Sequence, residues 1–411
     1  AEVRLEEAVG LALAIDLDIT DTIIVPLNNV RPATLFGTGK VDELKGVIAA
    51  GDIDLVIIDH ALSPIQQRNL ERAWECKVLD RTGLILEIFS LRAQTREGRL
   101  QVQLAHLEYD KSRLVRSWTH LERQRGGLGT VGGPGETQIE SDRRQIQDRI
   151  SKIKKQLETV TRTRGLHRKS RKKVPYPIVA LVGYTNAGKS TLFNKLAGAG
   201  VMVADMLFAT LDPTMREIRL KGGQRIIMSD TVGFISQLPT HLIAAFRATL
   251  EEVLDADLII HVRDIVTEET QPQAQDVEQV LETLGVGREN SDRNLIEVWN
   301  KIDLVSGQER EAIIEQSARN DHTVCVSAHT GEGMEELVDL IDTQLFRHHS
   351  ELEITLDMPG GKILHWIYQS CDVVHRHDHE DGSVELKLRV APAKQAGLEH
   401  IIKQARIKGD G

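Results

Sequence analysis

The sequence has few cysteines, few aromatic residues and no long apolar run. Its three cysteines, Cys76, Cys325 and Cys371, lie far apart and match no disulfide or metal-binding spacing. Aromatic residues make up 4% of the chain, and no apolar run approaches the roughly 20 residues that a membrane-spanning helix needs. The first ten residues carry acids and lack a signal-peptide pattern. We therefore expect a cytoplasmic protein in a reducing compartment, without stable membrane insertion.

The chain is instead rich in apolar residues and contains one block of positive charge. Its 411 residues, of which 41% are hydrophobic, suffice for several domains. The net charge is −10, yet the stretch from Arg143 to Lys173 carries 13 Lys and Arg against two Asp and Glu, which leaves −21 for the rest. Such a block indicates a nucleic-acid surface. The alternative is a solvated helix face followed by a basic linker.

One stretch has the sequence motif of a phosphate-binding loop. It reads G-x-x-x-x-G-K-S, follows the apolar run 178–182, which predicts a buried strand, and precedes 191–196, which predicts a helix. Its glycines let backbone N–H groups point at phosphate oxygens, and the helix adds its positive end. The lysine reaches the outer phosphates, and the serine hydroxyl ligates magnesium. The predicted contacts are Gly183, Tyr184, Thr185, Asn186, Ala187, Gly188, Lys189, Ser190 and Thr191.

Three further motifs follow in the order typical of guanine-nucleotide-binding domains. D-x-x-G, after a strand, offers a carboxylate for water-mediated magnesium binding and a glycine N–H for the γ-phosphate. N-K-x-D selects guanine through its last carboxylate, with the asparagine at the far ring edge and the lysine over the ring. S-A offers backbone N–H groups to the base oxygen. The predicted contacts are Asp230, Thr231, Val232, Gly233, Asn300, Lys301, Ile302, Asp303, Ser327, Ala328 and His329.

The stretch between the phosphate loop and Asp230 carries the remaining predicted metal ligand. A threonine there, free to move, completes the magnesium shell only when the γ-phosphate is present. We choose Thr210, with Thr214 as the alternative, so the predicted metal ligands are Ser190 and Thr210. The stretch is predicted to contact the nucleotide through Phe208, Ala209, Thr210, Leu211 and Asp212.

The position after Gly233 predicts that hydrolysis needs help from elsewhere. Many GTPases place a glutamine there to orient the attacking water, whereas this chain has Phe234. The amide oxygen of Asn186 is one candidate, through a K+ ion held beside the β- and γ-phosphates, and a partner is the other. We predict Lys189, Thr210, Gly233 and Asn186 as catalytic residues, Mg2+ and K+ as cofactors, and slow turnover in isolation.

The patterns along the chain predict a multidomain α/β protein. We expect a small parallel α/β domain over 1–90, a long helical hairpin with a basic linker over 91–174, a Ras-like phosphate-loop GTPase domain over 175–348, and a small α+β domain over 349–411. The stretch from Gly126 to Gly135 is too rich in glycine for a helix and forms the hairpin tip. We interpret this tip as a contact loop rather than a flexible loop without a partner.

Two weaker patterns favour an ordinary structural role. Residues 36–40 resemble half of a phosphate loop, but a turn before a helix explains them better. His375, His377 and His379 recur at a spacing of two, which suits one face of a strand. Exposed polar positions explain these histidines better than a metal site, because no second ligand cluster is evident.

The motifs together resemble those of the HflX family of ribosome-associated GTPases, in the Obg-HflX superfamily of the TRAFAC class. The resemblance covers most of the chain and rests on the early G-x-G-K, the glycine-rich hairpin ending in G-P-G-E-T, the G-Y-T-N-A-G-K-S-T loop, and F-A-T-L-D-P-T followed by D-T-V-G-F-I. It implies a GTPase that binds the large ribosomal subunit, is activated by it, and splits or rescues stalled ribosomes under stress. It also implies that the hairpin tip reaches ribosomal RNA and that magnesium is held at Ser190 and Thr210.

The chain departs from the family pattern at the hairpin tip. Thr130, Val131, Gly132 and Gly133 stand where the family has x-Arg-Gly, so one arginine is missing and one residue is added.

Some members are credited with an N-terminal ATPase activity, but residues 1–90 show no site for it. One other interpretation stays open, a GTP-gated RNA-binding factor of ribosome assembly or dormancy. A tRNA-modification GTPase would be expected to carry cysteines or a cofactor fold beyond the GTPase domain, which this sequence does not show. We expect a monomer.

Overall fold

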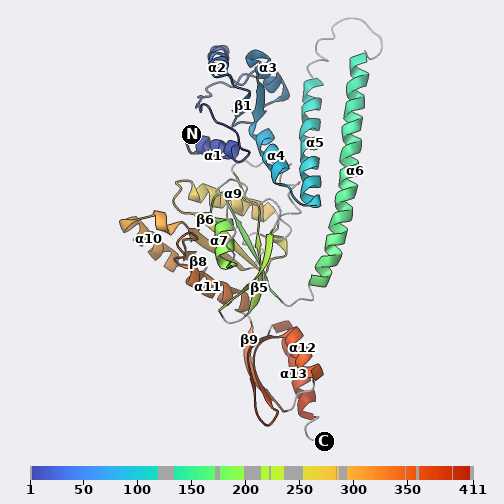
Figure 1. Cartoon of the computed structure of the whole chain (residues 1–411), viewed down its shortest axis with the longest axis vertical. Coiled ribbons are helices and arrows are strands. Elements are labelled where there is room, and N and C mark those ends of the chain that lie inside the picture. The colour runs from blue at the N-terminus through green and yellow to red at the C-terminus, as the bar shows by residue number, and fades with distance from the viewer. Residues whose placement is uncertain are drawn as a thin grey trace. The chain divides into compact units, whose positions relative to one another are not determined.

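The computed structural model describes residues 2–118, 134–171, 176–198, 214–221, 224–235, 253–283, 285–286, 294–347, 349–357, 361–390 and 392–407. The chain divides into two compact units, one made mainly of residues up to Thr163 and the other mainly of those after it. Both contain helices and strands, so the predicted α/β class is confirmed (Figure 1).

The first unit begins with a small parallel α/β arrangement. Strands β1 and β2 pair in parallel, with Leu55 opposite Lys77. Helix α3 begins directly after Ser63, whose hydroxyl accepts the N–H of Gln66 in a capping box, and Pro64 is its first residue. The elements are α1 (Glu2–Leu13), α2 (Thr38–Ala50), β1 (Leu55–Ile58), α3 (Pro64–Trp74), β2 (Lys77–Asp80) and α4 (Arg81–Arg92).

Two long helices follow, α5 (Arg96–Trp118) and α6 (Pro134–Arg171), and they lie side by side (Figure 1). Lys111 bonds Gln147 over 2.6 Å, and Lys154 pairs with Glu108 over 3.0 Å, so polar contacts join the two helices. The basic linker that we expected at the end of the range 91–174 is wrong in its first part, because α6 continues to Arg171. Residues 164–171 contain no proline, and most are good helix formers, so nothing local stops the helix. Tip residues 126–133 lie outside the described part of the chain.

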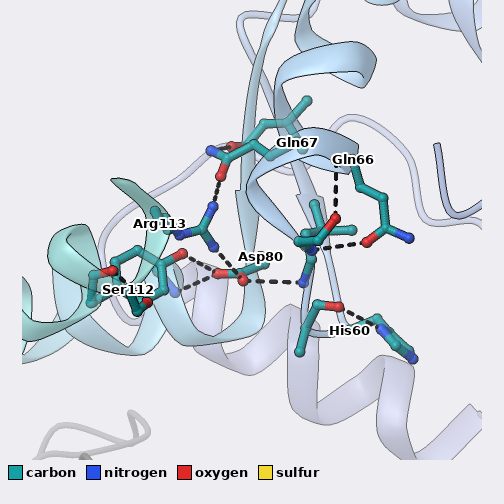
Figure 2. A network of polar contacts seen from close by, with 12 residues as sticks. His60, Gln66, Gln67, Asp80, Ser112 and Arg113 are labelled. Atoms are coloured by element: carbon teal, nitrogen blue, oxygen red, sulfur yellow. Dashed lines mark hydrogen bonds and ion pairs between the residues drawn. The ribbon is translucent and has the colours of Figure 1, made fainter. Parts of the chain in front are cut away.

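A buried carboxylate fastens α5 to the α/β part of this unit (Figure 2). Asp80, the last residue of β2, is 2% exposed. It accepts hydrogen bonds from Tyr109 Oη and Arg113 Nη2, both over 2.6 Å, and from the N–H of Leu62 over 3.2 Å. Arg113 also donates to Gln67 of α3. The start of the hairpin is therefore held by charge and hydrogen bonds as well as by packing.

The second unit contains a six-stranded sheet in the order β4-β5-β3-β6-β7-β8, parallel except for β4. Buried apolar residues cover both faces, with α7 and α11 on one and α9 on the other. The strands that we predicted before the phosphate loop and before D-x-x-G are present as β3 and β5. The elements are β3 (Ile178–Gly183), α7 (Lys189–Leu196), β4 (Thr214–Arg219), β5 (Arg225–Asp230), β6 (Leu258–Asp264), α9 (Thr270–Thr283), β7 (Asn294–Asn300), α10 (Gly307–Ala318), β8 (Thr323–Cys325) and α11 (Met334–Phe346).

The last part of this unit is a three-stranded antiparallel sheet in the order β10-β11-β9. Its elements are β9 (Ser350–Leu356), α12 (Gly361–Ser370), β10 (Asp372–Asp378), β11 (Val384–Val390) and α13 (Pro392–Ile407). Helices and an antiparallel sheet are both present, as we expected for an α+β region. His375, His377 and His379 are exposed, and the described residues contain no group of three or more His, Cys, Asp or Glu side chains that could hold a metal ion. Among the helices of the described residues, none has the length and apolar character to cross a membrane.

Candidate nucleotide site

Two glycines give the phosphate loop its shape. Gly183 ends β3 with φ +148°, and a Cβ there would lie 2.1 Å from the carbonyl oxygen of Val262. Gly188 has φ +90°, and a Cβ there would lie 2.1 Å from Asn300 Nδ2. Both positions combine a backbone conformation that favours glycine with a neighbour too close for any side chain. The loop between them ends at Lys189, the first residue of α7.

The Lys189 side chain lies inside the loop. It is 6% exposed, and its Nζ donates to the carbonyl oxygen of Tyr184 over 2.7 Å. Burial lowers the pKa of Lys189 to about 8, and the negative charge of Asp230 only partly opposes this shift. A phosphate group would restore the full charge of the lysine, so this side chain favours an anionic ligand.

Ser190 and Asp230 meet beside the loop. The Ser190 hydroxyl donates to Asp230 Oδ2 over 2.7 Å, and Asp230 is 2% exposed at the carboxyl end of β5. A hydroxyl and a carboxylate are oxygen donors of the kind that Mg2+ prefers. This donor pair fits a magnesium ion; Ser190 would be a direct ligand, and Asp230 would act through water.

Residues 231–235 run directly alongside the loop. The Thr231 hydroxyl donates to Leu181 O over 2.6 Å, and the N–H of Thr185 donates to Phe234 O over 2.6 Å. A Cβ on Gly233 would lie 2.8 Å from Thr185 Cγ2 and 3.0 Å from Lys189 Nζ, so the loop tolerates only glycine there. Val232 is buried at 7% exposure.

Phe234 and Ile235 belong to the core of the domain. They are 5% and 3% exposed, and Phe234 packs with Tyr184 and Val253. The side chain that follows Gly233 is therefore apolar and turned into the core. It has no group that could orient an attacking water, as the sequence led us to expect.

Asn300 braces two loops of the site. Its side chain is 1% exposed; Nδ2 donates to Ala187 O over 2.8 Å, and Oδ1 accepts the N–H of Ala328 over 3.0 Å. It thereby ties the phosphate loop to the loop after β8. The direct contact between Asn300 and the base that we expected stays a prediction, because both polar atoms already have partners.

The other residues predicted to contact the base differ in their exposure and in whether their polar groups are already hydrogen-bonded. Asp303 is exposed and accessible to a ligand. The N–H groups of Ser327 and Ala328 are already donated, to Glu332 O and to Asn300 Oδ1. A contact from either N–H to the base oxygen therefore needs a shift of this loop and stays a prediction. His329 is exposed, and Ile302 is 1% exposed and serves the core.

Of the remaining predicted residues, some lie in the described part of the chain and others do not. Asn186 is exposed with φ +59°, at the outer side of the loop, and Thr191 is half-buried on α7. Thr214, the alternative metal ligand, begins β4 and is exposed. The stretch from Phe208 to Asp212, which includes Thr210, lies outside the described residues.

One acidic residue of the site escaped the sequence-based prediction. Asp264 ends β6, and its Oδ2 lies 2.7 Å from Lys301 Nζ. The signal was available, because an acid follows the apolar run 258–262 and polar residues at the carboxyl ends of parallel strands commonly meet at the ligand edge. The order of the strands was needed to pair it with the lysine.

Comparison with known families gives four consecutive matches. They are a GTP-binding GTPase N-terminal model over residues 2–90, a GTP-binding GTPase middle region over 92–171, a 50S ribosome-binding GTPase over 178–301, and the HflX C-terminal domain over 312–408. The matches together span nearly the whole described chain.

Individual relatives agree with these matches. GTPase HflX of Magnetococcus marinus is 49% identical over 404 residues, covering 98% of this chain and 92% of that protein. GTPase HflX of Escherichia coli K12 is 44% identical over 361 residues, covering 88% and 83%. A crystal structure described as the complex of SsGBP and GDP has a TM-score of 0.51 at 27% identity, covering 83% and 95%. With this phosphate loop and this set of motifs, the chain belongs to the HflX family of GTPases.

Proposed function

We propose that this GTPase binds the large ribosomal subunit through its helical hairpin, is activated by it, and separates stalled ribosomes in the cytoplasm under stress. The observation that carries the proposal is a row of cations on the outer face of α6. The match to a family described as 50S ribosome-binding GTPases supports it.

The cation row follows the helical repeat. Arg144, Lys155 and Arg162 are exposed, at spacings of 11 and 18 residues. These spacings are about three and five whole turns at 3.6 residues per turn, so the three side chains lie along one line of the helix. The opposite face carries Ile150, which is 3% exposed, and the half-buried Leu157. The helix thus turns its apolar side inward and exposes a row of cations, beside which Asp148 and Glu158 are also exposed.

The length of α6 suits a helix that reaches a distant surface. Its 38 residues extend over about 57 Å at 1.5 Å per residue. The structure describes several exposed cations between residues 143 and 162. Of these, Lys154 alone pairs with a described carboxylate. Cations that have no acidic partner among the described residues, placed along a long helix, are suited to phosphate groups of folded RNA, which carry one negative charge per nucleotide.

Activation by a partner follows from the residues beside the γ-phosphate position. Lys189 would neutralise charge on the outer phosphates, and the Gly233 N–H would bond the γ-phosphate. Ser190, Asp230 and Thr210 would hold Mg2+, which supplies charge stabilisation at the phosphates when bound. Because Phe234 is turned into the core, the attacking water needs a group from elsewhere. We assign that role to the ribosome, with Asn186 holding K+ as an additional contribution.

The first experiment tests the docking surface. In the variant Arg144→Gln/Lys155→Gln/Arg162→Gln, we expect affinity for large subunits to fall roughly ten- to hundredfold and the salt dependence of binding to drop by about two to three phosphate contacts. The matched control Lys45→Gln/Lys77→Gln/Arg319→Gln removes three exposed cations elsewhere. Equal affinities for the two variants in co-sedimentation would refute the α6 surface.

The second experiment tests activation. GTP turnover is measured for the protein alone and with large subunits, at low and high potassium. We expect slow turnover alone and a rise of at least about a hundredfold with subunits, the scale on which partner-supplied groups accelerate GTPases. Turnover that is already maximal without subunits would refute the proposal.

Subunit separation is tested with whole ribosomes. Sedimentation of stalled ribosomes is compared in GTP and in a non-hydrolysable GTP analogue. We expect separation in GTP. Binding without separation in either nucleotide would favour a GTP-gated clamp that acts in ribosome assembly or dormancy.

A further inference from the structure

Asp264 and Lys301 form an ion pair at the carboxyl edge of the six-stranded sheet. Lys301 Nζ lies 2.7 Å from Asp264 Oδ2. The two side chains are 24% and 18% exposed, so the pair is sheltered from water. An exposed pair would contribute little, but a sheltered one restricts where the lysine lies.

The Asp264 carboxylate is held in position by contacts other than the one to Lys301. Asp264 Oδ1 accepts the N–H of Val266 over 3.1 Å, which closes a small turn after β6. Asp264 also lies opposite Asn300 in the register of β6 and β7, and the N–H of Ile265 donates to Asn300 O over 3.3 Å. The sheet therefore sets the position of the acid.

The lysine backbone is unusual in the same place. Lys301 has φ +71°, in the left-handed region that residues other than glycine rarely adopt. It precedes the 3-10 helix Ile302–Leu304, and the Ile302 N–H donates to Val326 O over 3.2 Å. The surrounding structure thus holds a strained lysine whose long side chain would otherwise sample many rotamers.

We infer that Asp264 is a positioning residue for guanine binding: it holds the Lys301 side chain in place so that the aliphatic stem lies ready against the base. This inference rests on the assignment of residues 300–303 to the base. Ordering the stem before binding removes an entropy cost from the association step. Affinity for guanine nucleotides should therefore depend on an acid that need not touch the nucleotide.

The test variant is Asp264→Asn. The asparagine oxygen still accepts the Val266 N–H, so the turn is retained and only the charge is lost. We expect the Kd for GDP and the KM for GTP to rise about tenfold, because a flexible lysine must be ordered on binding. The kcat at saturating GTP should stay unchanged, since the phosphate groups are untouched.

A double-mutant cycle separates positioning from general damage. Lys301→Met keeps an apolar stem but removes the ammonium group. If Asp264 acts through Lys301, adding Asp264→Asn to Lys301→Met should change the GDP Kd by less than about twofold. Thermal unfolding of each nucleotide-free variant reports whether the fold is intact.

Other outcomes distinguish the two claims. An unchanged GDP Kd in Asp264→Asn, with weaker binding in Lys301→Met, would overturn the role of Asp264 alone. If replacing Lys301 and Asp303 leaves guanine affinity unchanged, the base assignment fails, and this inference fails with it. Additive losses in the double variant would show that Asp264 acts independently of the lysine and would also overturn the inference.

Discussion

The Ser190 hydroxyl donates to Asp230 Oδ2 over 2.7 Å, which places a hydroxyl and a carboxylate from separate elements at one point beside the phosphate loop. Their oxygens form a donor pair that fits a magnesium ion. Losing the hydroxyl would leave a bound magnesium ion with one direct ligand fewer.

We therefore expect Ser190→Ala to lower magnesium-dependent GTP turnover by at least about a hundredfold, comparable to the loss of one strong electrostatic contact in a transition state. GDP binding measured with a chelator present should change far less. The control is Thr343→Ala, because the Thr343 hydroxyl donates to the backbone of its own helix at Asp339 O and not to any described residue of the site. Equal turnover in Ser190→Ala and wild type would contradict the magnesium assignment.

The buried Lys189 predicts a pH dependence of nucleotide binding. Its pKa of about 8 lies below the ordinary 10.5, so the nucleotide-free folded protein loses this proton at lower pH than the unfolded chain does. Between these two values the free energy of unfolding of the nucleotide-free protein should rise with pH.

Nucleotide phosphates favour the charged lysine, so binding above about pH 8 should take up a proton. We expect GDP affinity to fall by up to tenfold per pH unit in this window, which is the limit for one linked proton. Calorimetry in two buffers of different ionisation enthalpy measures the uptake directly. Pyrophosphate should show the same trend, because the lysine contacts phosphate rather than base. Constant affinity between about pH 7.5 and 9.5 would show that Lys189 does not titrate there.

Replacing Gly188 should cost more than the backbone strain of placing a side chain at positive φ, because the new side chain would also collide with Asn300. In Gly188→Ala the new Cβ would lie 2.1 Å from Asn300 Nδ2 and would disrupt the contact from Asn300 to Ala187. Gly285→Ala is a matched control, because its φ of +80° carries similar strain with no atom within 4 Å of the new Cβ. Both variants pay roughly 1–2 kcal/mol for the backbone conformation.

Beyond that shared cost, we expect only Gly188→Ala to weaken GDP binding, by at least about tenfold, since the phosphate-loop brace is lost. Fluorescence titration with a labelled GDP measures the difference. Similar GDP affinities for the two variants would show that the brace between Gly188 and Asn300 is unimportant.

The buried pair of Asp80 and Arg113 predicts a hairpin that loosens when either charge is removed. In Arg113→Met, the 2%-exposed Asp80 keeps the hydrogen bonds of Tyr109 and of Gly83 N–H but loses its cation. Breaking one side of a buried pair costs about 3–5 kcal/mol, so backbone hydrogen exchange along α5 should accelerate by at least about a hundredfold.

Arg99→Met is the control on the same helix, because Arg99 is exposed and its one side-chain bond within the described part of the chain goes to Thr95 O. Its effect should stay within about 0.5 kcal/mol. If both variants exchange at the wild-type rate along α5, the anchor at Asp80 does not hold the hairpin. Burial and the neighbouring Asp80 also raise the pKa of Tyr109 above its usual range, so this hydroxyl remains a donor.

Features that depend on neighbouring residues could be predicted from the sequence. The capping box at Ser63 and Gln66, the strand before Gly183 and the alternating strand 384–390 follow from hydrogen bonds or apolar periodicity within a few residues. The order of the nucleotide motifs predicted the GTPase for the same reason, because each motif is contiguous and follows its own strand.

Contacts between distant residues were decided only by the tertiary structure. Asp264 meets Lys301 because β6 and β7 are neighbours in register, and Asp80 meets Arg113 because α5 packs beside the end of β2. The Asn300 amide likewise bonds the phosphate loop at Ala187 and the loop after β8 at Ala328, which only the order of the strands brings together. No local pattern encodes which strand lies next to which, since that choice depends on how all the apolar faces are buried together. The sequence by itself therefore determined the chemistry that this chain carries, and the packing of the sheet decided which of its charges act in pairs.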